Sequence, residues 1–241
     1  MAYADITTND PNPIKRWLQR NRFVEAISLL PKEISPTCIL DFGGGDGELS
    51  LHLKEYRPVA QVICYEPSEE IFNEAHEKIS KSKYKNHIQL LDNIKNIKPE
   101  TVDVVYSLEV FEHLPKEETE KAIQEIHAML KPDGLVIIGV PNEIYLAALY
   151  KGIFRTIKRY GEFDTVPLNV LKCILGRPPK NRPIGELSKN VQYHFHHVGF
   201  DCRKLPSVFS TRFKLLSKRT SPFQHLGYLL TPEVYFVFKK T

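Results

Sequence analysis

A glycine-rich run, Asp41–Gly47, offers the clearest chemistry in the sequence. It reads Asp-Phe-Gly-Gly-Gly-Asp-Gly and follows a short apolar segment. Glycine adopts positive φ without strain and lets a backbone come close to a ligand. In the dinucleotide-binding pattern G-x-G-x-x-G, the third glycine position is taken here by Glu48. Acidic Asp41, Asp46 and Glu48 would repel a pyrophosphate, so the turn suits a cationic ligand better than a dinucleotide.

An acidic residue, Glu66, ends the next apolar segment, 23 positions after Gly43. A carboxylate at the end of the second strand of such a fold can accept hydrogen bonds from both hydroxyls of a ribose. The spacing therefore predicts a nucleoside-containing ligand with a positively charged part.

Histidines form a second group of candidates. His113 stands alone, whereas His194, His196 and His197 cluster in the segment Tyr193–His197. Histidine titrates near neutral pH and can take a proton from an oxygen nucleophile. Three histidines could bind zinc, but no cysteine or carboxylate stands at a matching spacing, so we expect no metal.

Strands and helices alternate around these residues. We expect strands over Cys38–Phe42, Gln61–Tyr65, Ile88–Leu91, Val102–Ser107, Leu135–Val140, Phe213–Leu216 and Val234–Phe238. We expect helices over Pro13–Leu30, Glu48–Tyr56, Ser68–Ser80, Lys116–Leu130 and Asp201–Ser210. This alternation predicts an α/β fold with a doubly wound, Rossmann-like sheet and right-handed crossovers.

Five segments, in order, resemble the motifs of the class I S-adenosylmethionine-dependent methyltransferases. They are Asp41–Gly47, Tyr65-Glu66-Pro67-Ser68, Leu91-Asp92-Asn93, Asp103–Leu114 and Leu130–Leu135. The fourth is similar to the small-molecule (type 11-like) branch of the family. One departure is Gly44, where the family usually has cysteine or serine. Together the matches cover roughly Ile39 to Pro141.

The resemblance implies a seven-stranded sheet with an antiparallel last strand and a helical, basic insertion after strand five. It also implies S-adenosylmethionine as the cofactor. The residues that would bind it are Asp41, Gly43, Gly44, Gly45, Glu66, Pro67, Asp92, Asn93, Ser107, Leu108 and Glu109. Glu66 would bind the ribose and Asp92 the adenine amino group, while Ser107 to Glu109 would pass beneath the methyl donor.

The same resemblance ranks the histidines. His197-Val198-Gly199-Phe200 is similar to a segment that many family members place over the active site. His197 is therefore the first candidate for a catalytic base, followed by His196 and His113.

We expect one methyltransferase domain over 1–241, with four parts. They are an N-terminal helical cap (1–34), a cofactor-binding core (35–141), a basic insertion that caps the acceptor (142–200), and a C-terminal helix with strands (201–241).

Charge is divided unevenly along the chain. Met1–Glu143 holds 16 Lys/Arg against 24 Asp/Glu, whereas Ile144–Leu230 holds 15 against 4. The second part should therefore attract an anionic partner. Within it, Ile144–Tyr160 is amphipathic, with Lys151, Arg155 and Lys158 on one face. Such a helix lies on an anionic membrane surface or covers a site with its basic side in solvent.

These features favour methyl transfer, at oxygen, to a small or lipid-linked anionic acceptor such as a glycan, a sugar or an isoprenoid intermediate. No signal peptide or spanning segment is evident, so we expect a cytoplasmic protein, either free or peripheral on the inner face of the membrane. Two alternatives stay open: a non-catalytic partner protein with this fold, and an RNA methyltransferase. Nucleic acid is otherwise disfavoured, because Ser107-Leu108-Glu109-Val110 replaces the Asn/Asp-Pro-Pro-Tyr/Phe motif of DNA amino-methyltransferases. The sequence leaves the oligomeric state open.

Overall fold

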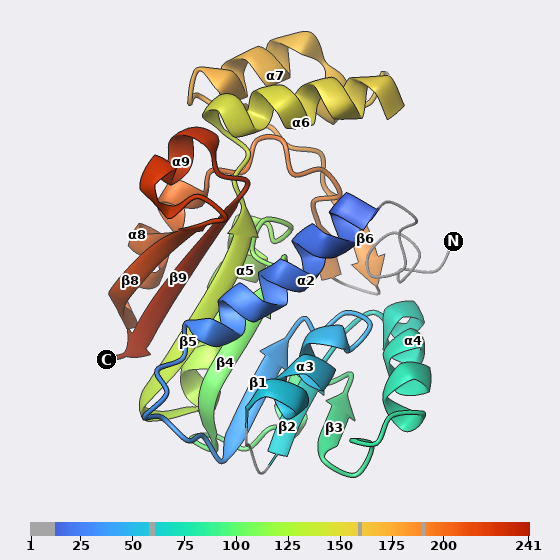
Figure 1. The fold of residues 1–241 in the computed structure, drawn as a ribbon, viewed down its shortest axis with the longest axis vertical. Coiled ribbons are helices and arrows are strands. Elements are labelled where there is room, and N and C mark those ends of the chain that lie inside the picture. Colours follow the sequence, from blue (N-terminus) through green and yellow to red (C-terminus); the bar gives the residue numbers. More distant parts are fainter. Residues whose placement is uncertain (1–12, 58–60, 159–160, 189–190) are drawn as a thin grey trace. The chain divides into compact units, whose positions relative to one another are not determined.

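The computed structural model describes residues 13–57, 61–158, 161–188 and 191–241, with side chains from Asn21 onward (Figure 1). The first twelve residues of the expected cap, the side chain of Lys158 and all of Tyr160 lie outside this description. The chain forms two compact units. Unit 1 holds the described residues up to Leu108, with Gln124–Ile138 and Val237–Thr241, and unit 2 holds Glu109–Ile123 and Gly139–Phe236.

A seven-stranded mixed sheet has the order β3-β2-β1-β4-β5-β9-β8. Its strands are β1 (Cys38–Phe42), β2 (Gln61–Tyr65), β3 (Ile88–Leu91), β4 (Val102–Leu108), β5 (Leu130–Pro141), β8 (Phe213–Ser221) and β9 (Glu233–Lys240). The pairs β1–β2, β1–β4 and β2–β3 are parallel. Figure 1 shows β9, the last strand of the chain, running opposite to β5. The predicted fold class is confirmed.

Burial explains why the central strands are continuous apolar runs. All five residues of β1 are buried, and Ile39 and Leu40 are 0% exposed. A parallel strand covered on both faces reads in this way rather than as an alternating pattern. The carboxyl ends of β1, β2 and β3 then lie at one edge of the sheet, because the strands are parallel and adjacent.

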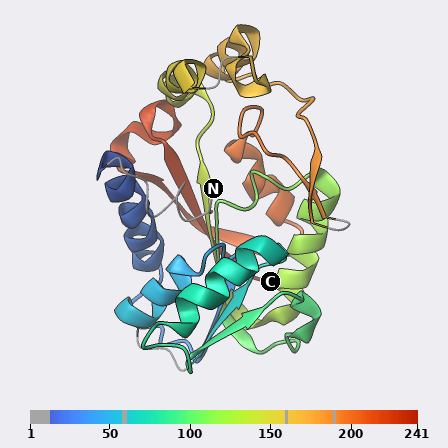
Figure 2. The same cartoon turned by 90° about the vertical axis from the view of Figure 1, so that its right-hand side faces the viewer.

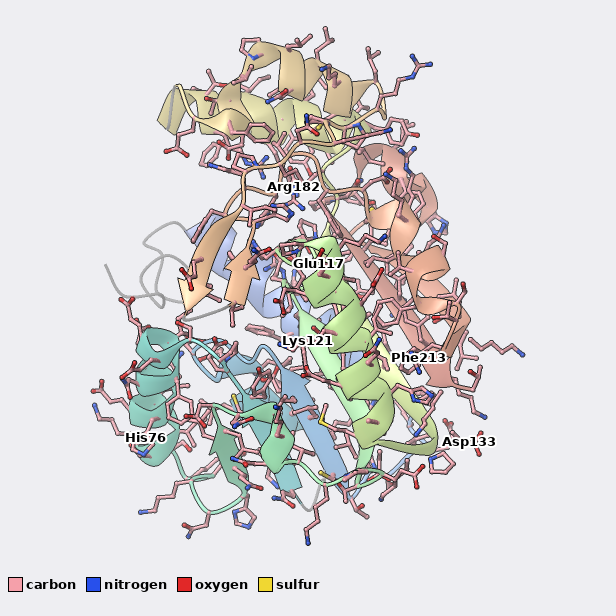
Figure 3. The ribbon with its side chains drawn as sticks, turned by 180° about the vertical axis from the view of Figure 1, so that it is seen from behind. His76, Glu117, Lys121, Asp133, Arg182 and Phe213 are labelled. Carbon is pink, nitrogen blue, oxygen red and sulfur yellow. The ribbon has the colours of Figure 1, made fainter. Side chains whose placement is uncertain are left out.

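Helices of unit 1 follow the predicted positions closely. They are α2 (Pro13–Ser28), α3 (Glu48–Tyr56) and α4 (Glu69–Ser80), and α5 (Lys116–Met129) enters the unit at Gln124. Ser68 is the N-cap of α4, but its side chain makes no capping hydrogen bond. Glu69 and Glu70 in the first turn still favour the helix start through the helix dipole. Figure 3 shows Glu117 and Lys121 along the exposed side of α5.

The end of α5 differs from the expectation. Residues 131–134, which fall between the expected helix Lys116–Leu130 and the expected strand Leu135–Val140, lie within β5, and the helix ends at Met129. Asp133 adopts a φ of 63° there. A Cβ on Gly134 would lie 2.7 Å from Leu130 Cδ2, so the backbone packs too closely for any other residue. The proline and glycine thus mark an irregular strand start rather than a separate loop.

Unit 2 contains the segment that interrupts the alternation. It holds α6 (Tyr145–Lys158), η2 (Phe163–Thr165), α7 (Pro167–Ile174), β6 (Gly185–Ser188), β7 (Val191–Tyr193), η3 (Cys202–Lys204), α8 (Leu205–Phe209), η4 (Gln224–Leu226) and α9 (Gly227–Leu230). Helices α6 and α7 lie side by side (Figure 2). Their approach is close, since a Cβ on Gly152 would lie 2.6 Å from Val170 Cγ1.

The expected helix Asp201–Ser210 is two shorter elements, η3 and α8. The side chain of Asp201 accepts a hydrogen bond from the backbone N–H of Arg203 and caps η3. Pro206 lies in the first turn of α8, the position in a helix that tolerates proline best. Among the described residues, no helix is long and apolar enough to cross a bilayer.

Candidate functional site

The glycine turn after β1 is built by backbone hydrogen bonds. The N–H groups of Gly43 and Gly44 both donate to the carbonyl of Tyr65, at 2.9 and 2.8 Å. Gly43, Gly45 and Gly47 have φ values of 74°, 56° and 78°, which only glycine adopts without strain. The turn is therefore fixed against the end of β2, and its shape requires the glycines found in the sequence.

Glu66 is held in place by the same turn. Its Oε2 accepts from Gly45 N at 3.0 Å, and its Oε1 accepts from Ser68 N at 2.9 Å. The side chain is 5% exposed. Burial raises the pKa of Glu66 to about 7, against the lowering effect of the two backbone donors. The structure thus brings Glu66 to the glycine turn, as the spacing predicted.

Charge near the turn is partly neutralised. Lys78 of α4 contacts Asp46 Oδ2 at 2.5 Å and Glu48 Oε2 at 2.9 Å. Asp41 accepts a hydrogen bond from Ser50 Oγ at 2.7 Å, and burial raises the pKa of Asp41 to about 7. Two of the three acids that were expected to attract a cation therefore already have one. The electrostatic argument rests on Asp41 and Glu66 alone.

Gly44 has a specific reason to be glycine. A Cβ at this position would overlap Cys64 Sγ, which is fully buried on β2, and would lie 3.2 Å from Asp41 Oδ2. Cys64 therefore fills the space that the usual cysteine or serine of the motif would need. The departure from the family pattern is compensated on the neighbouring strand.

The other predicted donor-site residues lie at strand ends. Asp92 and Asn93 follow β3 and are exposed, and Asn93 Oδ1 accepts from Lys95 N to cap η1 (Ile94–Asn96). Ser107, in β4, is 0% exposed, and its Oγ has no hydrogen-bond partner among the described residues. Leu108 ends β4. Glu109 begins unit 2 with a φ of 56° and donates its N–H to Gly139 O at 2.9 Å.

In unit 2, two of the three candidate histidines meet. His113 Nε2 and His197 Nε2 lie 3.0 Å apart, although 84 residues separate them in the chain. His113 Nδ1 is 2.6 Å from the carbonyl of His194, and its ring stacks on Tyr193 with an interplanar angle of 6°. Burial lowers the pKa of His113 to about 3 and also lowers the pKa of His197. Both imidazoles are therefore neutral at pH 7.

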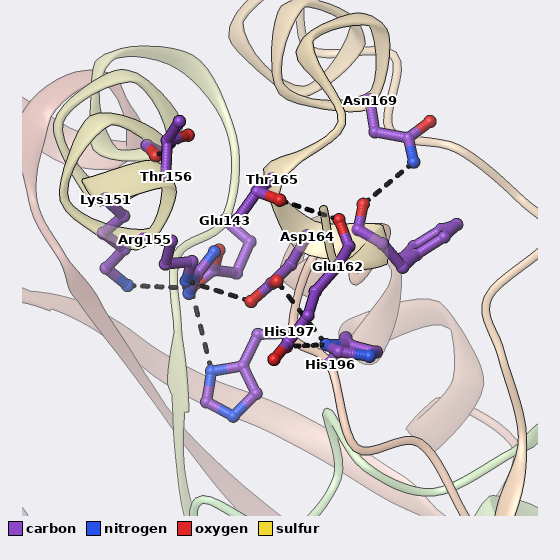
Figure 4. A network of polar contacts seen from close by, with 12 residues as sticks. Glu143, Lys151, Arg155, Thr156, Glu162, Asp164, Thr165, Asn169, His196 and His197 are labelled. Atoms are coloured by element: carbon purple, nitrogen blue, oxygen red, sulfur yellow. Dashed lines mark hydrogen bonds and ion pairs between the residues drawn. The ribbon is translucent and has the colours of Figure 1, made fainter. Parts of the chain in front are cut away.

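Glu143 lies behind His197 and is fully buried (Figure 4). Arg155 donates from both terminal nitrogens to its carboxylate, at 2.7 and 2.8 Å, and Lys151 Nζ lies 3.1 Å from Oε1. His197 Nδ1 is 3.8 Å from the same Oε1. The cations hold the pKa of Glu143 well below its usual range despite its burial. A permanent negative charge therefore faces the Nδ1 side of His197.

This network corrects the expected orientation of α6. Lys151 and Arg155 do share a face, but that face points inward, and neither lies in solvent or on a surface. The exposed face is apolar and consists of Leu146, Leu149, Tyr150, Ile153, Phe154 and Ile157. The buried acid at position 143 explains the reversal, because an unneutralised carboxylate inside the unit would be very costly.

His196 lies in a different cluster. Its Nδ1 is 3.6 Å from Asp164 Oδ1 and 3.9 Å from Glu162 Oε2 (Figure 4). Asp164 also contacts Arg155 Nε at 3.6 Å. Adjacent in sequence to His197, His196 thus faces acids rather than the imidazole pair.

A family model described as a methyltransferase domain matches residues 14–163, more than half of the chain. The chain belongs to this methyltransferase family. It is 34% identical over 109 residues to an uncharacterized methyltransferase of Oceanobacillus iheyensis, a match covering 44% of this chain and 48% of the relative. This chain thus spans about half of the length of the curated relative that it matches.

Solved structures share the fold at low sequence identity. A protein of Pyrococcus horikoshii is 14% identical with a TM-score of 0.62, over 99% of this chain and 96% of that one. The N-methyltransferase NodS of Bradyrhizobium japonicum, in complex with S-adenosyl-L-homocysteine, is 12% identical with a TM-score of 0.57, over 96% and 89%. The 1,6-didemethyltoxoflavin-N1-methyltransferase of Burkholderia thailandensis, also with S-adenosylhomocysteine, is 14% identical with a TM-score of 0.58, over 93% and 80%. The predicted membership of the methyltransferase family is confirmed, and these structures share its fold.

Several residues of the methyltransferase were missed by sequence reasoning. Glu143 stands two residues after β5, so its place just beyond the carboxyl end of a strand was the available signal, as it was for Glu66. Glu112 is 0% exposed, and its Oε1 lies 3.8 Å from His113 Nε2. No spacing rule predicts such a contact between the side chains of two consecutive residues. Arg182 (labelled in Figure 3) donates to the carbonyl of Glu112 at 2.7 Å.

Proposed function

We propose that this protein transfers a methyl group from S-adenosylmethionine to an oxygen atom of an anionic acceptor. The observation that carries the donor half is the Glu66 carboxylate, fixed by Gly45 N and Ser68 N against the glycine turn. When bound, the donor supplies a methyl group on a sulfonium, and the electrons of the broken C–S bond remain on sulfur.

The residues present fit that donor. Glu66 has acceptor capacity beyond its two backbone bonds, since an ionised carboxylate offers about four lone-pair sites. The hydroxyl of Ser107 is buried without a partner among the described residues and is available to a ligand. Asp92, exposed after β3, is available to an adenine amino group. Pro67 follows Glu66 and is half-buried, and the N–H of Gly43 is already used in shaping the turn.

Calorimetry of the purified protein with S-adenosylmethionine and S-adenosylhomocysteine tests the donor site. Micromolar affinity for both, with no binding of NAD, is expected. Glu66→Ala should weaken both at least tenfold, because the two ribose hydroxyls lose their acceptor. Glu70→Ala, an exposed acid in the same region of the chain, is the matched control and should bind as the wild type does. Equal binding by Glu66→Ala and wild type would sink the proposed donor site.

An oxygen acceptor is supported by the His113–His197 pair. Both rings are neutral, and each needs only its Nε2 lone pair to take part in removing a hydroxyl proton. His113 stands five residues after the last residue of β4 in the chain. We propose that the acceptor hydroxyl is deprotonated at this pair, and that His196, held by Asp164 and Glu162, does not take part.

A lipid-linked acceptor is supported by the apolar face of α6 and α7. Ile157 is 79% exposed and Leu175, at the end of α7, is 64% exposed. Exposed Lys172, Arg177 and Lys180 accompany this face. Apolar side chains beside cations match the interface of an anionic bilayer, which binds both kinds of group. We propose that this face places the protein on the membrane that carries its acceptor.

Flotation with phosphatidylglycerol and phosphatidylcholine vesicles tests this surface. The protein should float with the anionic vesicles, and less so at high salt. The double variant Ile153→Glu/Ile157→Glu should remain in the soluble fraction. Val24→Glu, at an apolar position on α2 that is 50% exposed, should float as the wild type does. A wild type that ignores anionic vesicles, or a double variant that still floats, would remove the membrane from the proposal.

A further inference from the structure

The two Nε2 atoms of His113 and His197 pose a protonation problem. They lie 3.0 Å apart, a distance at which something must bridge the two nitrogens. A carbonyl oxygen can only accept, so the 2.6 Å contact between His113 Nδ1 and His194 O places a proton on Nδ1. The ring proton of a neutral imidazole is thereby assigned to Nδ1, and the Nε2 of His113 presents its lone pair to His197.

His197 is biased toward the same tautomer. Its Nδ1 lies 3.8 Å from the Glu143 carboxylate, which favours a proton on that nitrogen. Two lone pairs then face one another across 3.0 Å. A pair of nitrogens arranged in this way, each ring oriented by an acceptor at its other nitrogen, is the arrangement of histidines that bind a metal ion.

Glu112 adds an oxygen ligand at the same point. Its Oε1 lies 3.8 Å from His113 Nε2, and the three ligand atoms of Glu112, His113 and His197 all lie within 4.8 Å of one another. Metal–nitrogen and metal–oxygen bonds of about 2.0–2.2 Å require ligand atoms within about 4 Å, so small side-chain rotations suffice. The carboxyl group of Glu112 is fully buried, and its backbone carbonyl is held by a hydrogen bond from Arg182 at 2.7 Å, so the ligand is fixed in place.

We infer that Glu112, His113 and His197 form a binding site for a divalent transition-metal cation. Two imidazoles and one carboxylate suit Zn²⁺, Mn²⁺, Fe²⁺ or Co²⁺ rather than Mg²⁺ or Ca²⁺, which prefer all-oxygen sites. The three ligands leave further coordination positions for oxygens of a substrate or for water. This inference deepens the proposed function: an acceptor hydroxyl bound to the cation would lose its proton more readily, with the histidines acting through the ion.

The second acidic cluster of unit 2 serves as a comparison. Glu162, Asp164 and His196 also lie close enough to share an ion. There, however, Arg155 Nε already lies 3.6 Å from Asp164, and a single imidazole is present. We therefore place the cation at Glu112, His113 and His197, and His196 becomes the control residue.

Cobalt binding tests the site in the absence of any methyl donor or acceptor. The full-length protein, without a histidine tag and stripped with a chelator, is titrated with Co²⁺ and followed by its visible absorption. One equivalent should bind and give the spectrum of a mixed nitrogen and oxygen ligand set, and Zn²⁺ should displace it. His197→Ala and Glu112→Gln should each weaken Co²⁺ binding by 10-fold or more, whereas His196→Ala should bind as the wild type does.

The result separates this inference from the donor site. Calorimetry with S-adenosylmethionine on the same variants reports whether they are folded and bind the donor. Donor binding retained with cobalt binding lost in His197→Ala and Glu112→Gln supports the cation site. A wild type that binds the donor but no Co²⁺, or a His197→Ala variant with unchanged Co²⁺ binding, would overturn it and leave a hydrogen-bonded histidine pair instead. If the wild type does not bind S-adenosylmethionine, that result counts against the proposed function and not against the cation site.

Discussion

At the scale of single residues, the donor site depends on two carboxyl groups that are buried and energetically costly. Burial raises the pKa values of Asp41 and Glu66 to about 7. A cationic ligand that donates hydrogen bonds to Glu66 recovers part of this cost, so the carboxylate is poised to favour such a ligand.

The affinity for S-adenosylmethionine should therefore depend on pH. Below its raised pKa of about 7, Glu66 carries a proton that must leave before the carboxylate can accept both ribose hydroxyls. Calorimetry at pH 6, 7 and 8 should show affinity rising with pH and levelling off above 7, with at most about tenfold change per unit. Glu66→Gln should bind more weakly and lose this dependence. A Glu66→Gln profile parallel to that of the wild type would contradict the assignment.

Gly44 and Cys64 should behave as a coupled pair. Gly44→Ala should destabilise the protein by about 1–3 kcal/mol, because its Cβ would overlap the buried Cys64 Sγ. Cys64→Ala removes that sulfur, so the double variant should be more stable than the sum of the single changes. Urea unfolding of the four proteins gives the coupling energy directly. Additive effects would show that the turn relaxes without help from β2.

At the scale of elements, α6 is the unexpected part of the fold. Its inward face carries Lys151 and Arg155, which satisfy Glu143 with three short polar contacts. Its outward face is apolar. This helix is held by the buried ionic cluster, by the buried side chains of Ala147 and Ala148, and by its contacts with α7 and α9.

Glu143→Gln should be strongly destabilising. The change leaves two buried cations without their main counter-charge, which costs about 3–5 kcal/mol. Glu120→Gln is the matched control, since Glu120 pairs with Lys116 on the surface of α5 at 3.8 Å and should matter by less than about 0.5 kcal/mol. Chemical denaturation measures both. Similar small effects for the two variants would mean that water reaches the Glu143 cluster.

At the scale of the whole molecule, the two proposed ligands address different compact units. The donor residues up to Leu108 belong to unit 1, whereas Glu112, His113 and His197 belong to unit 2. Each ligand should stabilise the parts that bind it, because binding to the native state alone shifts local opening equilibria.

Hydrogen exchange read by mass spectrometry should resolve this division. S-adenosylhomocysteine should slow exchange mainly over residues 41–48 and 61–68. Co²⁺ should slow exchange mainly over residues 109–114 and 193–198. His197→Ala should abolish the second effect and spare the first. Protection of the same peptides by both ligands would contradict separate sites.

The sequence by itself determined the sheet, the glycine turn and the position of Glu66 beside that turn. These follow from local patterns: continuous apolar runs that must be buried, glycines at positions of positive φ, and Glu66 placed after a strand whose parallel neighbour is followed by Gly43. Strands β1, β2 and β3 accordingly begin and end where the pattern predicts. Most of the differences lie at helix ends and in β5, β8 and β9, which are longer than the pattern predicts.

Only the tertiary structure decided which histidines meet and which side of α6 faces inward. Periodicity groups residues on a face but does not say whether that face is buried, because a buried Glu143 can draw cations inward against their usual preference for water. Likewise, His113 and His197 meet across 84 residues, while the adjacent His196 points elsewhere. Such contacts depend on the path of the whole chain, and no local spacing encodes them.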